Sequence, residues 1–269
     1  MAYLAVDGDR RIYYERYSGT GRPVVLVHGW GMSVRVWDLT LPALLDAGHE
    51  VVALDHRGCG LSDKDFDDMS IGAVGSDVVR LVETLELDGV VLNGWSLGGA
   101  VAVDAAAKLG GRLAGLVLTG GATPRYLQGD GFPHGGTPEI FGQTLTALRD
   151  TRPEFLHALA SGVCHAEVGQ RTVDWMWAIF MQTSAAADAT LAGLGDLDQR
   201  DLLPKITVPA MLIHGVHDAI VPHDIGVAAS QLLPEGRLVD FEHSGHAPFL
   251  EETARYRQEL LAFLGSLAS

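Results

Sequence analysis

Apolar and polar residues along the chain follow two alternating patterns. Short runs rich in β-branched residues predict about eight strands, at residues 3–6, 11–17, 23–29, 50–58, 89–96, 113–121, 209–218 and 236–246. Between most of them, apolar residues recur at helical spacing, which predicts helices over 36–48, 70–87, 97–111, 224–234 and 248–268. Because such alternation is typical of βα units, we predict an α/β fold with a mostly parallel sheet, helices on both of its faces and an opening hairpin.

The alternation stops between residues 123 and 205, where no run predicts a strand. Residues 123–140 are rich in Gly and Pro and are expected to be irregular, whereas residues 153–163 and 173–194 have helical spacing. An insertion of this size in an open sheet more often covers the edge of the sheet than folds alone. We therefore predict a core of residues 1–122 and 206–269 and a helical lid of residues 123–205.

Composition and charge argue against a nucleic acid partner and a membrane span. The 269 residues are 47% hydrophobic and 20% charged, as expected of a globular protein with a sizeable core. Since 34 Asp and Glu outnumber 19 Lys and Arg, the formal charge of −15 disfavours a nucleic acid partner. No apolar run approaches the length of a membrane span, about 18 residues, and the first residues lack a signal-peptide pattern, so we expect a cytoplasmic protein.

The metal-binding residue types are scattered. Cys59 and Cys164 stand far apart in the sequence, and histidines such as His214 and His217 lack the spacing of a metal site. We therefore expect no disulfide framework, no metal and no cofactor.

Residues 93–99, NGWSLGG, place Ser96 between glycines just after the apolar run Val90–Leu92. Gly and Ser dominate ordinary turns, so this stretch alone fits either a simple turn or a strained turn that lifts a nucleophilic hydroxyl toward a substrate. In open parallel sheets, functional side chains gather at the carboxyl ends of strands, where this chain has Ser96, Asp218 and His246. A serine nucleophile needs a base, and the base needs a carboxylate, so these three residues favour the second interpretation.

Other residues compete for two of these roles. Asp55, which ends a more central strand, and Asp224 are alternatives to Asp218 as the acid. The carboxylate of Asp218 would also suit the cap of a helix. His243, in the same HSGH turn, is the main alternative to His246 as the base.

The chain resembles the α/β-hydrolase fold family over essentially its whole length. The resemblance rests on five motifs in the order and at the strand ends typical of the family: LVHGWG, DHRGCGLS, GWSLGG, LIHGVHDAIVP and HSGHAPFLEE. It implies a catalytic triad of Ser96, Asp218 and His246 and an oxyanion hole made by the backbone N–H groups of Leu97 and Trp30. Within the family, HGWG, GWSLGG and GHAPF are similar to motifs of the carboxylesterases that remove the methyl ester from pimeloyl-carrier-protein.

The predicted function is hydrolysis of a small-molecule carboxylic ester or lactone through an acyl-Ser96 intermediate. Carbon–carbon bond hydrolases and amidases use the same framework, so they remain alternatives. A second class is a non-enzymatic small-molecule receptor on a hydrolase scaffold, although such a protein has no need for a base and an acid together.

Aromatic residues of the predicted lid suggest where the substrate binds. Trp175, Trp177 and Phe180, together with Trp30 from the core, are expected to line an apolar acyl or aryl pocket. Ordinary packing between helices would give the same aromatic pattern.

Overall fold

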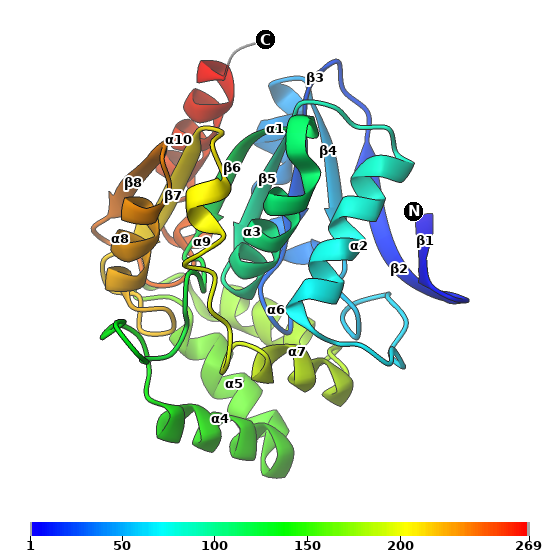
Figure 1. Cartoon of the computed structure of the whole chain (residues 1–269). Helices are drawn as coiled ribbons and strands as arrows, with labels where there is room; N and C mark the ends of the chain where they lie inside the picture. Colours follow the sequence, from blue (N-terminus) through cyan, green and yellow to red (C-terminus); the bar gives the residue numbers. More distant parts are fainter. Residues whose placement is uncertain (1, 268–269) are drawn as a thin grey trace.

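A computed structural model describes residues 2–267 of the chain. Its centre is an eight-stranded sheet in the order β1-β2-β4-β3-β5-β6-β7-β8 (Figure 1). The strands are β1 (Ala2–Asp7), β2 (Arg10–Tyr17), β3 (Gly21–Val27), β4 (His49–Leu54), β5 (Val90–Trp95), β6 (Leu113–Thr119), β7 (Ala210–Gly215) and β8 (Gly236–Phe241). Strand β2 is antiparallel to both of its neighbours, and the other pairs are parallel. The predicted α/β sheet and its opening hairpin are confirmed.

Helices cover both faces of this sheet. Helices α2 (Ile71–Thr84), α3 (Leu97–Leu109) and α8 (His223–Leu232) lie in front of the strands in Figure 1, whereas α1 (Leu41–Asp46) and α10 (Thr253–Ser266) lie behind them. The short helix α9 (Pro248–Glu251) precedes α10, so the helix predicted over 248–268 is broken at Glu252. Residue 268 of that helix, and residues 1 and 269 at the ends of the predicted core ranges, lie outside the described residues. Because both faces of the sheet are covered, every residue of β5 is buried.

The chain between β6 and β7, residues 120–209, forms the segment that we call the helical insertion. Its helices are α4 (Pro138–Asp150), α5 (Arg152–Gly162), α6 (Gln170–Phe180) and α7 (Asp188–Ala192), and they lie together below the sheet in Figure 1. The helix predicted over 173–194 is interrupted after Phe180. Residues 138–140, predicted to be irregular, are instead the first turn of α4, because Thr137 caps the helix through its side chain and Pro138 suits the first helical position.

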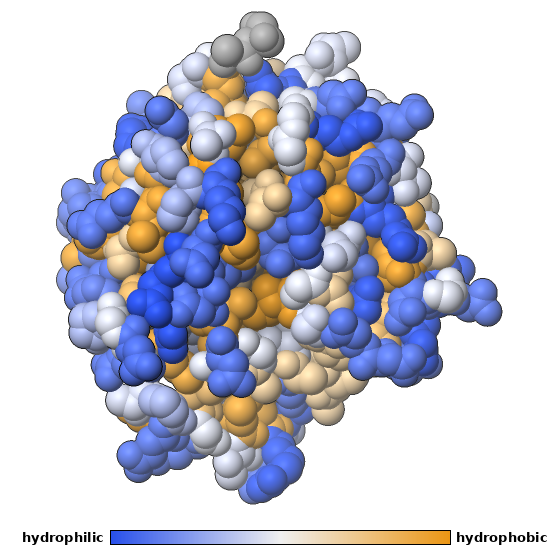
Figure 2. All heavy atoms as spheres, viewed as in Figure 1, coloured by the Kyte–Doolittle hydropathy of each residue, from blue (hydrophilic) through white to orange (hydrophobic). Residues whose placement is uncertain are grey.

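Polar residues cover most of the face seen in Figure 2, and apolar residues reach the surface in smaller patches between them. Among residues 2–267, no helix combines the length and the apolar character that crossing a bilayer requires.

A buried ion pair holds the turn that follows β4. The guanidinium of Arg57 donates to both carboxylate oxygens of Asp77 on α2, at 2.6 and 2.7 Å, and to the carbonyl of Asp68 at 2.7 Å. The same turn supports the helical insertion, because the N–H of Ser184 donates to the carbonyl of Gly58 at 3.0 Å. The Arg57–Asp77 pair therefore fixes part of the frame on which the insertion rests.

Breaking this pair from one side is expected to destabilise the fold. The side chains of Arg57 and Asp77 are 6% and 3% exposed, so Asp77→Ala leaves a buried cation without its partner and lowers the free energy of unfolding by about 3–5 kcal/mol. The matched control is Asp88→Ala, which breaks an exposed pair with Arg112 (Asp88 is 78% exposed) and changes the free energy by less than about 1 kcal/mol. Urea denaturation measures both free energies of unfolding. Equal losses in the two variants would contradict the stabilising role of the buried Arg57–Asp77 pair.

Candidate active site

Ser96 lies in a strained turn between β5 and α3. Its backbone has φ +57° and ψ −125°, a region that residues other than Gly rarely adopt and that costs about 1–3 kcal/mol. Three backbone hydrogen bonds of 2.8–3.0 Å hold it there. The N–H of Ser96 donates to the carbonyl of Thr119, and the carbonyl of Ser96 accepts from the N–H groups of Gly99 and Ala122. This turn differs from an ordinary Gly and Ser turn because its conformation is costly and is held by hydrogen bonds to both the N–H and the carbonyl of Ser96.

Close packing around the turn requires small residues. A Cβ at Gly98 would overlap the carbonyl oxygen of Val27, so helix α3 can lie directly against the end of β3 only with glycine at this position. On the other side, a Cβ at Gly29 would come within 3.0 Å of the Cβ of Ser96. The turn after β3 and the turn after β5 are therefore in contact.

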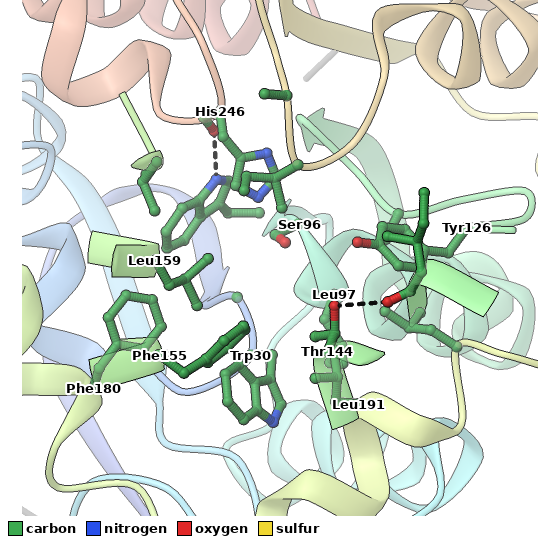
Figure 3. Close-up of a pocket in the computed structure, with 18 residues that line it drawn as sticks. Trp30, Ser96, Leu97, Tyr126, Thr144, Phe155, Leu159, Phe180, Leu191 and His246 are labelled. Atoms are coloured by element: carbon green, nitrogen blue, oxygen red, sulfur yellow. Dashed lines mark hydrogen bonds between the residues drawn. The ribbon is translucent and has the colours of Figure 1, made fainter. Parts of the chain in front are cut away.

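His246 is fixed by hydrogen bonds to its ring and its backbone. Nδ1 of the ring is 2.7 Å from Oδ2 of Asp218, the backbone N–H donates to the carbonyl of Val163 at 2.9 Å, and the backbone carbonyl accepts from the indole N–H of Trp95 at 2.7 Å. With Nδ1 engaged, Nε2 is the ring nitrogen left to act as a base. The His246 ring and the Ser96 side chain lie next to each other at the same cavity in Figure 3.

Asp218 is a buried carboxylate with several partners. Oδ1 accepts from the N–H groups of Ile220 and Val221 at 2.9 and 2.8 Å, and Oδ2 faces His246 and, at 3.4 Å, Nε2 of His214. Burial alone would raise the pKa of Asp218, but the charge of His246 and the hydrogen bonds from both histidines bring that pKa below its usual value. Asp218 is therefore ionised at neutral pH.

The competing residues lie in other surroundings. Asp55 accepts from the N–H groups of Val34 and Leu61 at 2.7 Å each, and burial raises its pKa to about 6. Asp224 is exposed on α8, where its carboxylate is 3.7 Å from His134. His243 is exposed as well. Of the candidate acids and bases, Asp218 and His246 are the two that the structure pairs.

The residues expected to form an oxyanion hole flank Ser96. Leu97 is the first residue of α3, so its N–H has no acceptor within the helix, and the positive end of the helix dipole points to the same place. Trp30 follows Gly29 in the turn that contacts Ser96, and both Trp30 and Leu97 line the cavity. The indole N–H of Trp30 donates to the carbonyl of Ala187, which holds its ring in the cavity wall.

The cavity at Ser96 has a volume of about 280 Å³, just below the ~300–1,000 Å³ typical of ligand pockets. Residues of the core and of the helical insertion line it together, and labelled insertion residues lie on both sides of Ser96 in Figure 3. The insertion contributes Ala122, Tyr126, Ile140, Thr144, Phe155, Leu159, Val163, Phe180, Leu191 and Leu194.

Phe180 lines the cavity, whereas Trp175 and Trp177 do not. The buried residues of α6 are Met176, Ile179 and Phe180, whereas Trp175 and Trp177 are only partly buried. The ring of Trp177 packs edge-on against His157 of α5, with 5.2 Å between the ring centroids. Both tryptophans pack against the hydrophobic core cluster and stay outside the cavity lining.

Glu251 is a contributor that the sequence analysis does not single out. Its carboxylate accepts from four backbone N–H groups, two in the His246 loop (Gly245 and Ala247) and two in the insertion (His165 and Ala166), at 2.6–3.1 Å. Glu251 thus ties the loop of the candidate base to the insertion. Its position five residues after His246, in α9, is the signal available in the sequence.

Among the described residues, no three or more His, Cys, Asp and Glu side chains gather in a group that could hold a metal ion. The polar groups at the cavity are those of an acyl-transfer site: a hydroxyl, an imidazole with a buried carboxylate, and backbone N–H groups.

Comparison with known proteins places this geometry in a family. The family model of the alpha/beta hydrolase fold matches residues 22–253. The chain is 32% identical to a non-heme chloroperoxidase of Streptomyces lividans over 97% of this chain and 98% of that protein. It is 29% identical to a pimeloyl-[acyl-carrier protein] methyl ester esterase of Aliivibrio fischeri over 95% and 98%.

A solved structure agrees with these relatives. An esterase from Exiguobacterium antarcticum matches with a TM-score of 0.95 and 28% identity, over 98% of this chain and 99% of that chain. The chain belongs to the α/β-hydrolase fold family, and it is a hydrolase enzyme of that family.

Proposed function

We propose that this protein hydrolyses small, largely apolar carboxylic esters or lactones through a covalent acyl-Ser96 intermediate. The observation that carries the proposal is the buried His246–Asp218 pair beside a strained Ser96, at one end of an apolar cavity. Esterases among the similar proteins support the same chemistry.

The first half of the proposed reaction forms the acyl-enzyme. Oγ of Ser96 attacks the ester carbonyl while Nε2 of His246 accepts the hydroxyl proton, and the carboxylate of Asp218 stabilises the imidazolium. The backbone N–H groups of Leu97 and Trp30 hold the oxyanion of the tetrahedral intermediate, each contributing about 3–4 kcal/mol. The C–O bond then breaks, and His246 gives its proton to the leaving alcohol.

Water repeats the sequence in the second half. His246 accepts a proton from the water as the water attacks the acyl carbon, and the Ser96–acyl bond breaks as the proton returns to Oγ. The products are the carboxylic acid and free enzyme. In a lactone, acid and alcohol leave as one hydroxy acid.

Residues 123–205 of the helical insertion are proposed to act as a lid over Ser96. The support is the lining of the cavity, to which the insertion contributes many of the residues around Ser96. A lid of this kind keeps water from the site and strengthens the electrostatic interactions inside it.

Replacing the nucleophile tests the proposal directly. Ser96→Ala is expected to fold normally and to lose at least about 1,000-fold in kcat on p-nitrophenyl acetate, because only binding and the oxyanion hole remain. Ser76→Ala, which removes an exposed hydroxyl from α2, is the control and should hydrolyse the ester as wild type does. Turnover by Ser96→Ala within tenfold of wild type would refute the nucleophile, and an absence of ester hydrolysis by wild type would refute the proposed reaction.

The role of Asp218 is tested by an isosteric change. Asp218→Asn removes the charge that orients and stabilises His246 and is expected to lower kcat by as much as about 10⁴-fold. Asp224→Asn changes a carboxylate that is 73% exposed and serves as the control with wild-type kcat. If steady-state kinetics showed instead that Asp224→Asn loses kcat while Asp218→Asn keeps the wild-type value, the acid would be Asp224.

The wall formed by Phe180 is expected to recognise bulky acyl groups. Phe180→Ala should lower the ratio of kcat/KM for p-nitrophenyl benzoate to that for the acetate by about 10–200-fold, because a small acetyl group scarcely touches this wall. Trp175→Ala, outside the cavity lining, should leave the ratio unchanged. Phe180→Leu provides a milder truncation, and equal losses on both esters in the two Phe180 variants would place the acyl group elsewhere.

A further inference from the structure

The cavity contains few polar side chains, and several of them already have partners in the protein. The indole N–H groups of Trp30 and Trp95 donate to backbone carbonyls at 2.9 and 2.7 Å. The hydroxyl of Thr144 donates to the carbonyl one turn earlier in α4, at 3.2 Å. The donor hydrogens of these three groups are therefore engaged within the protein, and the proposed reaction uses Ser96 and His246.

The hydroxyl of Tyr126 is the polar group of the lining that remains. Within residues 2–267 it forms no hydrogen bond, and Figure 3 shows it directed into the cavity, on the side where Ser96 lies. The ring is held from behind by Phe141 of α4 in an edge-on contact, with 5.6 Å between the centroids. The ring is thus supported on one side, and the hydroxyl has no partner among the described residues.

The protonation state of Tyr126 makes it a donor. Burial and the nearby negative charge of Asp218 raise the pKa of Tyr126 to about 12, so the phenol keeps its proton at neutral pH. Because this donor faces a largely apolar cavity and has no partner in the described part of the protein, a substrate oxygen that accepts its hydrogen bond is favoured over a carbon at the same place.

We propose that Tyr126 determines specificity by donating a hydrogen bond to a second acceptor oxygen of the substrate, separate from the reacting ester. This inference rests on the proposed ester hydrolysis. The preferred substrates are then small esters or lactones with an apolar skeleton and one further keto or ether oxygen, whose apolar part contacts residues such as Phe155, Leu159 and Phe180. A purely hydrocarbon ester of the same shape leaves the phenol unpaired and reacts more slowly.

Pairs of nearly isosteric esters test this specificity. The p-nitrophenyl esters of methoxyacetic and butanoic acid differ by an ether oxygen in place of a methylene, and those of 4-oxopentanoic and pentanoic acid differ by a keto oxygen. For each pair, the ratio of kcat/KM for the oxygenated ester to that for the hydrocarbon ester is measured in wild type and in Tyr126→Phe. Comparing variants cancels the intrinsic reactivity of the esters.

Tyr126→Phe is expected to lower this ratio by about tenfold or more for at least one pair, because the hydroxyl is lost while the shape of the cavity is kept. Tyr17→Phe, which removes a phenol hydroxyl that donates to Glu15 away from the cavity, should keep the wild-type ratio. The melting temperature of Tyr126→Phe should equal or exceed that of wild type, since its hydroxyl has no partner in the protein.

Two outcomes would overturn the inference: ratios unchanged for both pairs, or a lower melting temperature with equal losses on all four esters, which would indicate a structural role. Failure of the proposed function has a different signature. In that case wild type would hydrolyse none of the esters, or Ser96→Ala would hydrolyse them as well as wild type does.

Discussion

The hydrogen bond between Nδ1 of His246 and the carboxylate of Asp218 is buried, and much of the surrounding structure holds it in place. An ionised carboxylate is costly to bury unless hydrogen bonds replace its water. Here two backbone N–H groups and His214 accompany His246 around Asp218. Trp95 and Val163 fix the backbone of His246 from two sides. The orientation of the imidazole toward Ser96 follows from these contacts.

The fold brings these groups together from distant parts of the chain. Because β5, β7 and β8 are parallel, the turns carrying Ser96, Asp218 and His246 all lie at the carboxyl edge of the sheet. The insertion is coupled to the same point, since Glu251 binds backbone N–H groups of both the His246 loop and the insertion. The cavity wall and the candidate base are thereby held in one network.

Sequence alone was informative where local patterns decide the structure. The central strands could be predicted because their apolar runs are buried on both faces. Ser96, Asp218 and His246 could be singled out because each follows a strand. The cavity wall was harder to predict, since it depends on how the helices of the insertion pack. Helical periodicity does not show that Phe180 faces the cavity while Trp175 and Trp177 do not. Likewise, Tyr126 lies in a Gly- and Pro-rich stretch without any periodic signal, and tertiary folding brings it to the cavity.

The central claim is that His246 and Asp218 activate Ser96 as a nucleophile. An alkylphosphonate p-nitrophenyl ester measures this most directly, because an activated serine releases one p-nitrophenol and keeps the phosphonyl group. The account predicts one equivalent of released p-nitrophenol, loss of esterase activity in proportion, and a phosphonyl adduct that peptide mass spectrometry locates on Ser96. Full inactivation with the adduct on another residue, or persistent activity after stoichiometric labelling of Ser96, would contradict it.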